Sequence, residues 1–171
     1  MIPDNWIWWY GKHCFFSMSS VKPSGETFDY IDIDSINNRK QLITNPKKIK
    51  VSEAPSRATR KLDTGDTLFS MVRPYLLNIA FVSEKYKNCI ASTGFYVYKP
   101  MPFITNPMFL FYLLQSPYVI NGLMQYMKGD NSPSINGGNI ESFMYPMPPL
   151  NEQVIIANRL TDLLVKLELL Y

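Results

Sequence analysis

The chain has 171 residues, of which 46% are hydrophobic and 18% are charged, and its formal net charge is +3. This length and composition predict one folded domain with a sizeable core and exclude an intrinsically disordered chain. Two cysteines without metal-ligand spacing, no apolar run of about 18 residues and no signal-peptide pattern predict a cytoplasmic protein without a disulfide framework, zinc site or membrane span.

The first third of the chain predicts several short strands. Trp6, Trp8, Trp9 and Tyr10 form a dense aromatic segment, for which core packing is the expected use. Residues 28–33 alternate apolar and polar side chains as a half-buried strand does. Residues 42–43 and 49–51 are further strand candidates, so this part of the chain favours a β-rich region.

Charge is distributed unevenly over the same region. Four acids and no base lie between residues 26 and 34, whereas residues 39–61 hold eight bases against one acid, a local charge of +7. Such a run is either a solvated face or the footprint of a polyanion. Residues 54–61 predict one helical turn or a tight loop, which would bring Arg57, Arg60 and Lys61 together.

Residues 64–75 and 91–100 predict two buried strands at the centre of a mixed sheet, which residues 79–82 complete. Each stretch opens on a turn signal, continues with β-prone residues and closes with a base and a proline. Arg73 is placed at the end of the first strand, where it either reads a partner or satisfies backbone carbonyls.

Two helices and a polar loop follow. Asn106-Pro107 and Ser116-Pro117 each combine an N-cap residue with proline at the first helical position, which predicts helices over residues 107–115 and 117–127. Residues 128–139 form a loop rich in hydrogen-bonding side chains, which is either a recognition loop or a mobile connector.

The last predicted element is a helix that starts near Asn151 after a proline-rich lead. Its apolar residues are spaced by four, three, four and three, which is the seam of a coiled coil. We expect this seam to bind partner helices, and its members are Ile156, Leu160, Leu163, Leu167 and Leu170.

Several of these segments resemble one known family. They are residues 2–6, 54–58, 65–68 with Arg73-Pro74, 92–95 and, most specifically, the Pro-Pro-Leu-Asn-Glu-Gln segment at 148–153. Together they resemble a target recognition domain of a type I restriction-modification specificity subunit, and the resemblance covers essentially the whole chain. It implies a subunit with two such domains, each reading half of a split DNA target, with helices between them that dock methyltransferase subunits. This chain departs from the pattern because it has one domain and one helix.

The sequence argues against an enzyme. His13 is the only histidine, so a Ser-His-Asp triad or a histidine-rich metal site has no conventional form here, and no glycine-rich phosphate loop is present. Two alternatives stay open: a recognition domain from a fused type II restriction-methylation enzyme, and a protein-interaction module that uses the C-terminal helix.

The resulting prediction is an α+β fold with a central mixed sheet, flanking helices and a long coiled-coil-type helix. Residues 1–148 would form the recognition domain and 149–171 the start of a spacer or dimerisation helix. No cofactor, metal or catalytic residue is expected. The expected partners are double-stranded DNA, a methyltransferase subunit, a restriction subunit and a possible second copy of the chain. The DNA-contacting candidates are Lys22, Arg57, Arg60, Lys61, Arg73, Lys128, Asn131, Ser132, Ser134 and Asn136.

Overall fold

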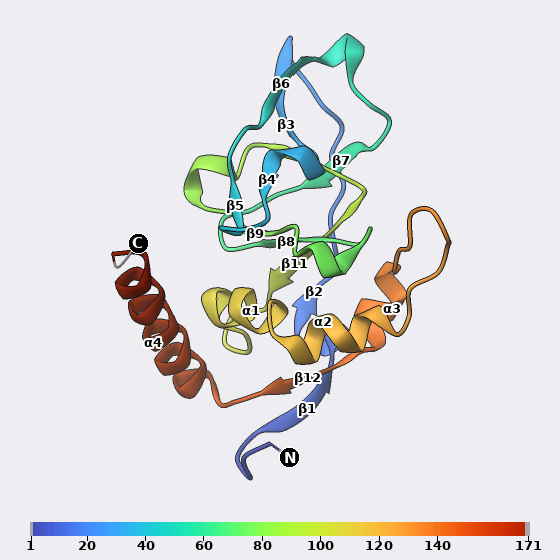
Figure 1. Ribbon diagram of the computed structural model, residues 1–171. Helices are drawn as coiled ribbons and strands as arrows, with labels where there is room; N and C mark the ends of the chain where they lie inside the picture. The colour runs from blue at the N-terminus through green and yellow to red at the C-terminus, as the bar shows by residue number, and fades with distance from the viewer. Residues whose placement is uncertain (1, 170–171) are drawn as a thin grey trace.

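The computed structural model describes residues 2–169 and combines helices with small sheets (Figure 1). The central sheet is antiparallel, in the order β2 (Phe15–Phe16), β11 (Phe95–Pro100), β8 (Thr67–Ser70) and β9 (Ile79–Phe81). Strands β8 and β11 pair directly, so the prediction that these two segments form the centre of a sheet is confirmed. Every residue of β8 is buried, because helices cover one face of this sheet and the second sheet covers the other.

A second sheet has the order β6 (Lys47–Lys50), β3 (Thr27–Ile31), β10 (Ile90–Ser92) and β7 (Ala58–Lys61). Its β3–β10 pair is parallel, whereas its other pairs are antiparallel. The structure therefore divides the strands between two four-stranded sheets, in place of the one central mixed sheet that the sequence predicts. The parallel pairing joins segments about sixty residues apart, which no local sequence signal reports.

The prediction of a helical turn or tight loop over residues 54–61 is wrong for its second half. A turn closes where Ala58 N donates to Pro55 O at 2.9 Å, and strand β7 begins at that residue. The strand is extended because both of its edges are paired: β10 lies on one side, and residues 19–21 hydrogen-bond to it on the other. Arg60 and Lys61 therefore follow strand alternation, in place of the helical spacing expected for them.

Two short ribbons complete the β-structure. Strand β1 (Ile7–Tyr10) pairs with β12 (Met144–Met147), and β4 (Ile36–Asn37) pairs with β5 (Leu42–Ile43). The expected core role of the first aromatic segment is only partly met, because Trp8 and Tyr10 are 40% and 45% exposed. A two-stranded ribbon has one face against the body and one toward solvent, which explains the difference.

The helices begin where the sequence predicts. Helices α1 (Pro107–Leu114) and α2 (Pro117–Met124) are capped by Asn106 and Ser116, whose side chains accept from the backbone N–H of Phe109 and Val119. Helix α3 (Gly137–Ser142) starts inside the predicted loop of residues 128–139. Short 3₁₀ turns are η1 (Gly11–His13), η2 (Ile33–Ser35), η3 (Val51–Glu53), η4 (Pro74–Leu76) and η5 (Glu84–Tyr86).

Helix α4 (Leu150–Glu168) projects from the body and carries the last described residues (Figure 1). Gln153 and Ala157 are buried and Thr161 is half-buried, so residues four apart form the face that meets the body. The hydroxyl groups of Tyr112 in α1 and Thr161 lie 2.8 Å apart. After Thr161, residues 162–167 of the helix are all exposed. Within residues 2–169, no helix is both long enough and apolar enough to cross a membrane.

Candidate nucleic-acid interface

The loop over residues 128–135 is paired to the chain that follows strand β8. Ile135 N donates to Met71 O at 3.0 Å and Arg73 N donates to Pro133 O at 2.9 Å. Val72 and Ser134 form an antiparallel bridge, and Ser134 forms another with Lys128. Residues 71–78 and 128–135, called the two-loop unit below, are therefore held together by backbone hydrogen bonds. This pairing argues against a mobile connector.

Arg73 lies beyond the end of β8 and not within it. Its backbone is left-handed, with φ +47° and ψ +59°, which is a costly conformation for a residue with a side chain. The exposed guanidinium donates through Nη2 to Asn131 O at 2.8 Å, across to the tip of the opposite loop. Of the two roles expected for Arg73, the structure thus shows contact with a backbone carbonyl.

The other predicted loop residues differ in their surroundings. Asn131 and Ser132 are exposed at the tip, whereas Ser134 is half-buried in the ladder. Asn136 is exposed, but its side chain accepts from Asn139 N at 3.0 Å and caps helix α3. The side-chain nitrogen of Asn136 takes no part in this cap. Lys128 is exposed where the loop leaves α2.

A hollow of about 460 Å³ opens beside the two-loop unit. Polar groups on its wall come from three separate segments, because Asn38, Arg73 and Ser132 all line it. Asn38 Nδ2 also donates to Leu76 O at 2.8 Å, which ties the β4–β5 ribbon to this surface. No local sequence signal points to Asn38, since only tertiary pairing brings it here.

Arg57 is connected to the two-loop unit by successive backbone hydrogen bonds. Thr93 N donates to Arg57 O at 2.9 Å, Gly94 O accepts from Met71 N at 3.0 Å, and Met71 O accepts from the loop residue Ile135. The exposed Arg57 turn, the β10–β11 turn and the two loops thus lie in sequence along one edge of the molecule. Figure 1 shows β7 and the loop before α3 on the same side.

The predicted basic trio does not share one surface. Arg60 lies opposite Ala91 and Lys61 opposite Ile90, so their side chains leave opposite faces of the sheet. Arg60 is half-buried, and its Nε has no hydrogen-bond partner among the described residues. Lys61 lines a separate hollow of about 390 Å³ together with Lys22 and Lys87.

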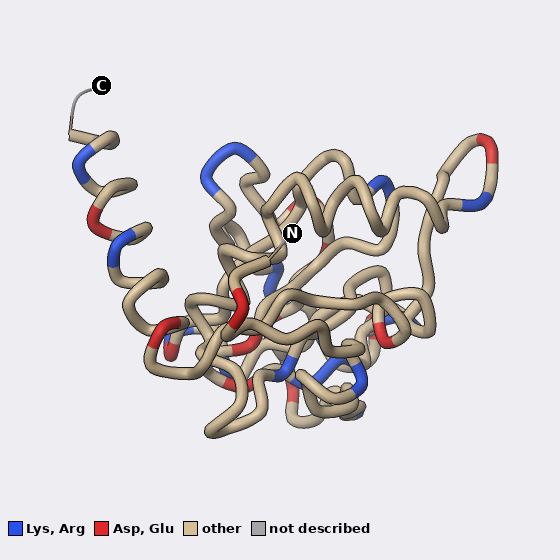
Figure 2. The backbone as a smooth tube through the Cα atoms, turned by 90° about the horizontal axis from the view of Figure 1, so that it is seen from below, with Lys and Arg blue, Asp and Glu red and all other residues tan. Residues whose placement is uncertain are grey.

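The local charge of +7 is reduced by ion pairs with the acidic run. Because β3 and β6 are antiparallel neighbours, Lys47 lies within 2.6 Å of Asp32 and 3.5 Å of Asp34, and their hydrogen bonds and charges raise its pKa. Lys61 also lies 3.5 Å from Asp63. Figure 2 shows blue and red segments distributed over the whole backbone. Arg57 has no such ion pair among the described residues.

A buried ionic cluster stabilises the turn before β8. Lys99 is 8% exposed and contacts Asp66 and Asp63, with a distance of 2.9 Å to the latter. Burial raises the pKa of the Asp66 carboxyl, whereas the hydrogen bond from Lys99 lowers the pKa of Asp63. This cluster fixes a turn whose Gly65 has φ +92°, so we assign it a structural role.

The predicted partner-binding seam lies mostly in solvent. Ile156 is half-buried, but Leu160, Leu163 and Leu167 are 36%, 54% and 52% exposed, and Leu170 lies outside the described residues. An apolar groove of about 910 Å³ runs between the outer part of α4 and the body, with Arg39 and Lys40 among the residues that line it. Within residues 2–169, α4 is a single helix of 19 residues and forms no long coiled coil.

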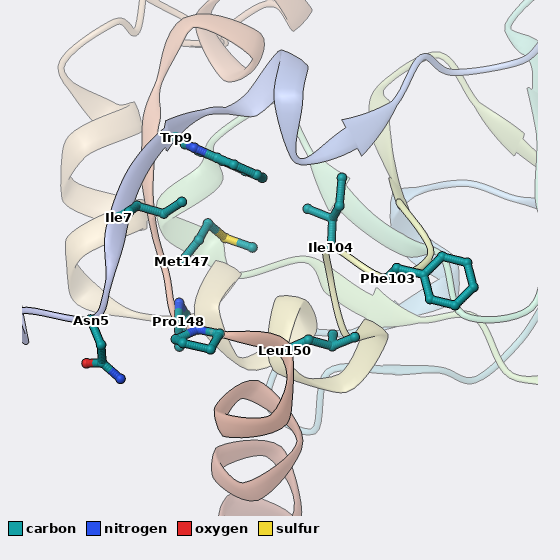
Figure 3. A pocket seen from close by; sticks show the side chains of 9 residues that line it. Asn5, Ile7, Trp9, Phe103, Ile104, Met147, Pro148 and Leu150 are labelled. Atoms are coloured by element: carbon teal, nitrogen blue, oxygen red, sulfur yellow. The ribbon is translucent and has the colours of Figure 1, made fainter.

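A smaller hollow of about 220 Å³ lies where α4 begins (Figure 3). Its lining is mostly apolar and includes Ile7, Trp9, Met147 and Leu150. Phe103 at its edge is 92% exposed and has φ +65°. Groups of three or more histidine, cysteine, aspartate or glutamate side chains that could hold a metal ion are absent from the described part of the chain.

Comparison with known proteins gives concordant matches. The family model for the type I restriction modification DNA specificity domain matches residues 10–170. A curated relative, the type I restriction enzyme HindI specificity subunit of Haemophilus influenzae, is 30% identical over 146 residues, which cover 82% of this chain and 30% of the relative.

Two solved structures are also similar. The HsdS subunit from Thermoanaerobacter tengcongensis superposes with a TM-score of 0.89 and 32% identity, over 99% of this chain and 44% of that one. A chain from a study of complex assembly and conformational transition of the type I R-M system gives a TM-score of 0.90 and 31% identity, over 99% and 45%. The chain therefore spans less than half the length of these relatives.

Proposed function

Because this chain belongs to the type I restriction modification DNA specificity family, we propose that it reads one half of a split DNA target and catalyses no reaction itself. The observation that carries this proposal is the two-loop unit. Its exposed polar tip, Asn131 and Ser132, belongs to a loop that pairs with the chain after β8, and backbone hydrogen bonds connect this chain through the β10–β11 turn to Arg57. Side-chain amides and hydroxyls bind base edges, while arginine and lysine bind phosphates, so these groups supply both kinds of contact.

In this proposal residues 1–148 form the recognition domain. Arg57, Arg60, Lys61 and Lys22 supply phosphate contacts, and residues 128–136 together with the region of Arg73 face the bases. The separation of Arg60 and Lys61 on opposite sides of β7 supports unequal contributions from the four bases. Arg57 is the strongest candidate, because its turn is continuous with the two-loop unit and no ion pair compensates its charge within residues 2–169.

Residues 149–171 form the start of a helix that binds other subunits. The exposure of Leu163 and Leu167 supports this role, since a helix of this length gains most of its stability from packing of its apolar face. The proposed partners are a methyltransferase subunit, a restriction subunit and, through an antiparallel pairing of α4, a second copy of the chain. Such a pair would present two recognition domains with twofold symmetry.

The test of DNA recognition is a binding titration at two salt concentrations followed by selection. We expect the chain to bind duplex DNA with an affinity that falls as salt rises, and to enrich a short motif from a randomised duplex library. Co-purification with the methyltransferase encoded beside it, followed by sequencing of methylated sites, would identify the full target. An affinity for duplex that does not change with salt, or a library without enrichment, would contradict the proposal.

A further inference from the structure

The turn between β8 and β9 has features that its role as a connector does not require. Arg73 and Leu77, which flank 3₁₀ turn η4, both have left-handed backbones, with φ +47° and +54°. Between them, Tyr75 and Leu76 are 42% and 41% exposed. Left-handed backbone at a residue other than glycine carries a cost, and exposed apolar side chains add no stability. A plain hairpin connection needs neither.

The turn is nevertheless rigid. Pro74 is buried, Ser70 N donates to Asn78 O at 3.0 Å across the base of the turn, and Asn38 Nδ2 holds the carbonyl of Leu76. The backbone at Tyr75 and Leu76 is therefore held in place. Side chains on a fixed backbone lose less conformational entropy on binding than those on a mobile loop, which suits them to contact.

Arg73 connects this turn to the polar loop. Its backbone N–H donates to Pro133 O, and its side chain donates to Asn131 O, so both ends of one residue bind the opposite loop. The left-handed backbone at Arg73 lies where the chain turns from this pairing into η4. Arg73 therefore connects the turn that carries Tyr75 and Leu76 to the loop that carries Asn131 and Ser132.

We propose that Arg73 is a positioning residue that fixes residues 129–133 against turn η4, and that Tyr75 and Leu76 form a further DNA-contact surface. The ligand of this surface is the same DNA as in the proposed function, and this inference rests on that function. Apolar side chains beside polar ones read a base pair by contact with the thymine methyl group, whereas amides and hydroxyls bind the neighbouring base edges. Sequence is then read by the two loops jointly, and Arg73 acts through them without touching a base.

The first test uses the free protein. In the Arg73→Ala variant, amide hydrogens of residues 129–133 should exchange about tenfold faster, because one hydrogen bond to a charged group is lost. Arg73→Lys should show an intermediate increase, since lysine lacks the planar fork of arginine. Arg159→Ala on α4 is the control and should leave loop exchange unchanged. Unchanged exchange in Arg73→Ala would overturn the positioning role.

The second test is selection from a randomised duplex library. Arg73→Lys keeps the charge, so it should keep both the affinity for random duplex and its salt dependence while losing preference at several adjacent base pairs. Tyr75→Ala should lose roughly tenfold in preference at the base pairs it contacts. Tyr10→Ala, a tyrosine of similar exposure on β1, should lose none.

Three results would overturn the inference. Loss of preference at a single base pair in Arg73→Lys would make Arg73 a direct reader. If Arg73→Ala lost the same affinity for every duplex and showed a smaller salt dependence, Arg73 would be a phosphate contact. Unchanged preference in Tyr75→Ala would remove turn η4 from the interface. If instead the wild type shows no preference, the proposed function itself fails, and the exchange experiment still reports on the loop contact.

Discussion

Gln153 is the residue that ties helix α4 to the body. Its side chain is 1% exposed and donates to Ile104 O and Pro148 O, both at 2.9 Å, while it accepts from Asn106 N at 2.8 Å. The neighbouring Glu152 accepts from Asn5 Nδ2 and Trp6 Nε1, both at 2.8 Å. The Glu-Gln pair of the most family-specific segment thus has a structural function: it joins the start of the chain, the N-cap of α1 and the start of α4.

A Gln153→Ala change should lower the free energy of unfolding by about 3 kcal/mol, because three hydrogen bonds are lost and their backbone partners stay buried. Urea denaturation monitored by circular dichroism measures this. Gln125→Ala is the control, since Gln125 is exposed and its side chain donates a long hydrogen bond of 3.4 Å to Asn121 O, and the change should alter stability by less than about 0.5 kcal/mol. Equal effects of the two changes would show that the buried amide does not anchor the helix.

Helix α4 is attached along one face only, and its seam residues lie beside that face. Leu160 lies directly before Thr161, whose hydroxyl contacts Tyr112, and Leu167 lies beyond that contact; the two leucines are 36% and 52% exposed. An apolar stripe that the chain's own body leaves exposed is typical of an assembly surface.

The Leu160→Asp, Leu167→Asp double variant should therefore remain folded, with its thermal unfolding midpoint close to that of the wild type. It should lose self-association in analytical ultracentrifugation, or lose methyltransferase binding in a pull-down. Asn158→Asp is the matched control, because it adds a negative charge on a different side of the same helix. Unfolding of the double variant at a concentration where the wild type is monomeric would mean that the seam packs on its own domain.

At the scale of the whole molecule, the basic residues divide between two sides of β7. Arg57 is continuous with the two-loop unit, whereas Lys22 and Lys61 line a different hollow. A duplex is a stiff rod over the length of this domain, so it contacts one side closely.

Arg57→Ala should weaken binding to every duplex sequence and reduce the slope of log affinity against log salt by about 0.9. Lys61→Ala should have a smaller effect, because Asp63 already lies 3.5 Å from its Nζ. Fluorescence anisotropy titrations at several salt concentrations measure both. An effect of Lys61→Ala as large as that of Arg57→Ala would place the duplex across both sides and restore the basic segment as one surface.

The sequence by itself determined the local features of this protein. The caps at Asn106 and Ser116, the two central strands, the start of α4 and the spacing of its apolar residues all depend on residues within a few positions of one another. The family was also evident from the sequence, because its motifs occur in order along the chain. These features can be predicted without knowing which distant segments of the chain pack together.

Only the tertiary structure decided which residues share a surface. Pairing of β7 with β10 turned the expected turn at residues 54–61 into a strand, and the two-residue alternation of a strand then placed Arg60 and Lys61 on opposite sides. Antiparallel pairing of β3 with β6 brought Lys47 to Asp32. The Arg73 side chain donates to Asn131 O, which lies 58 residues further along the sequence. The contacts of β7 and β6 follow from strand register, which is set by burial of the whole fold and is not encoded in a local segment. The Arg73 contact follows from the pairing of two loops outside the strands.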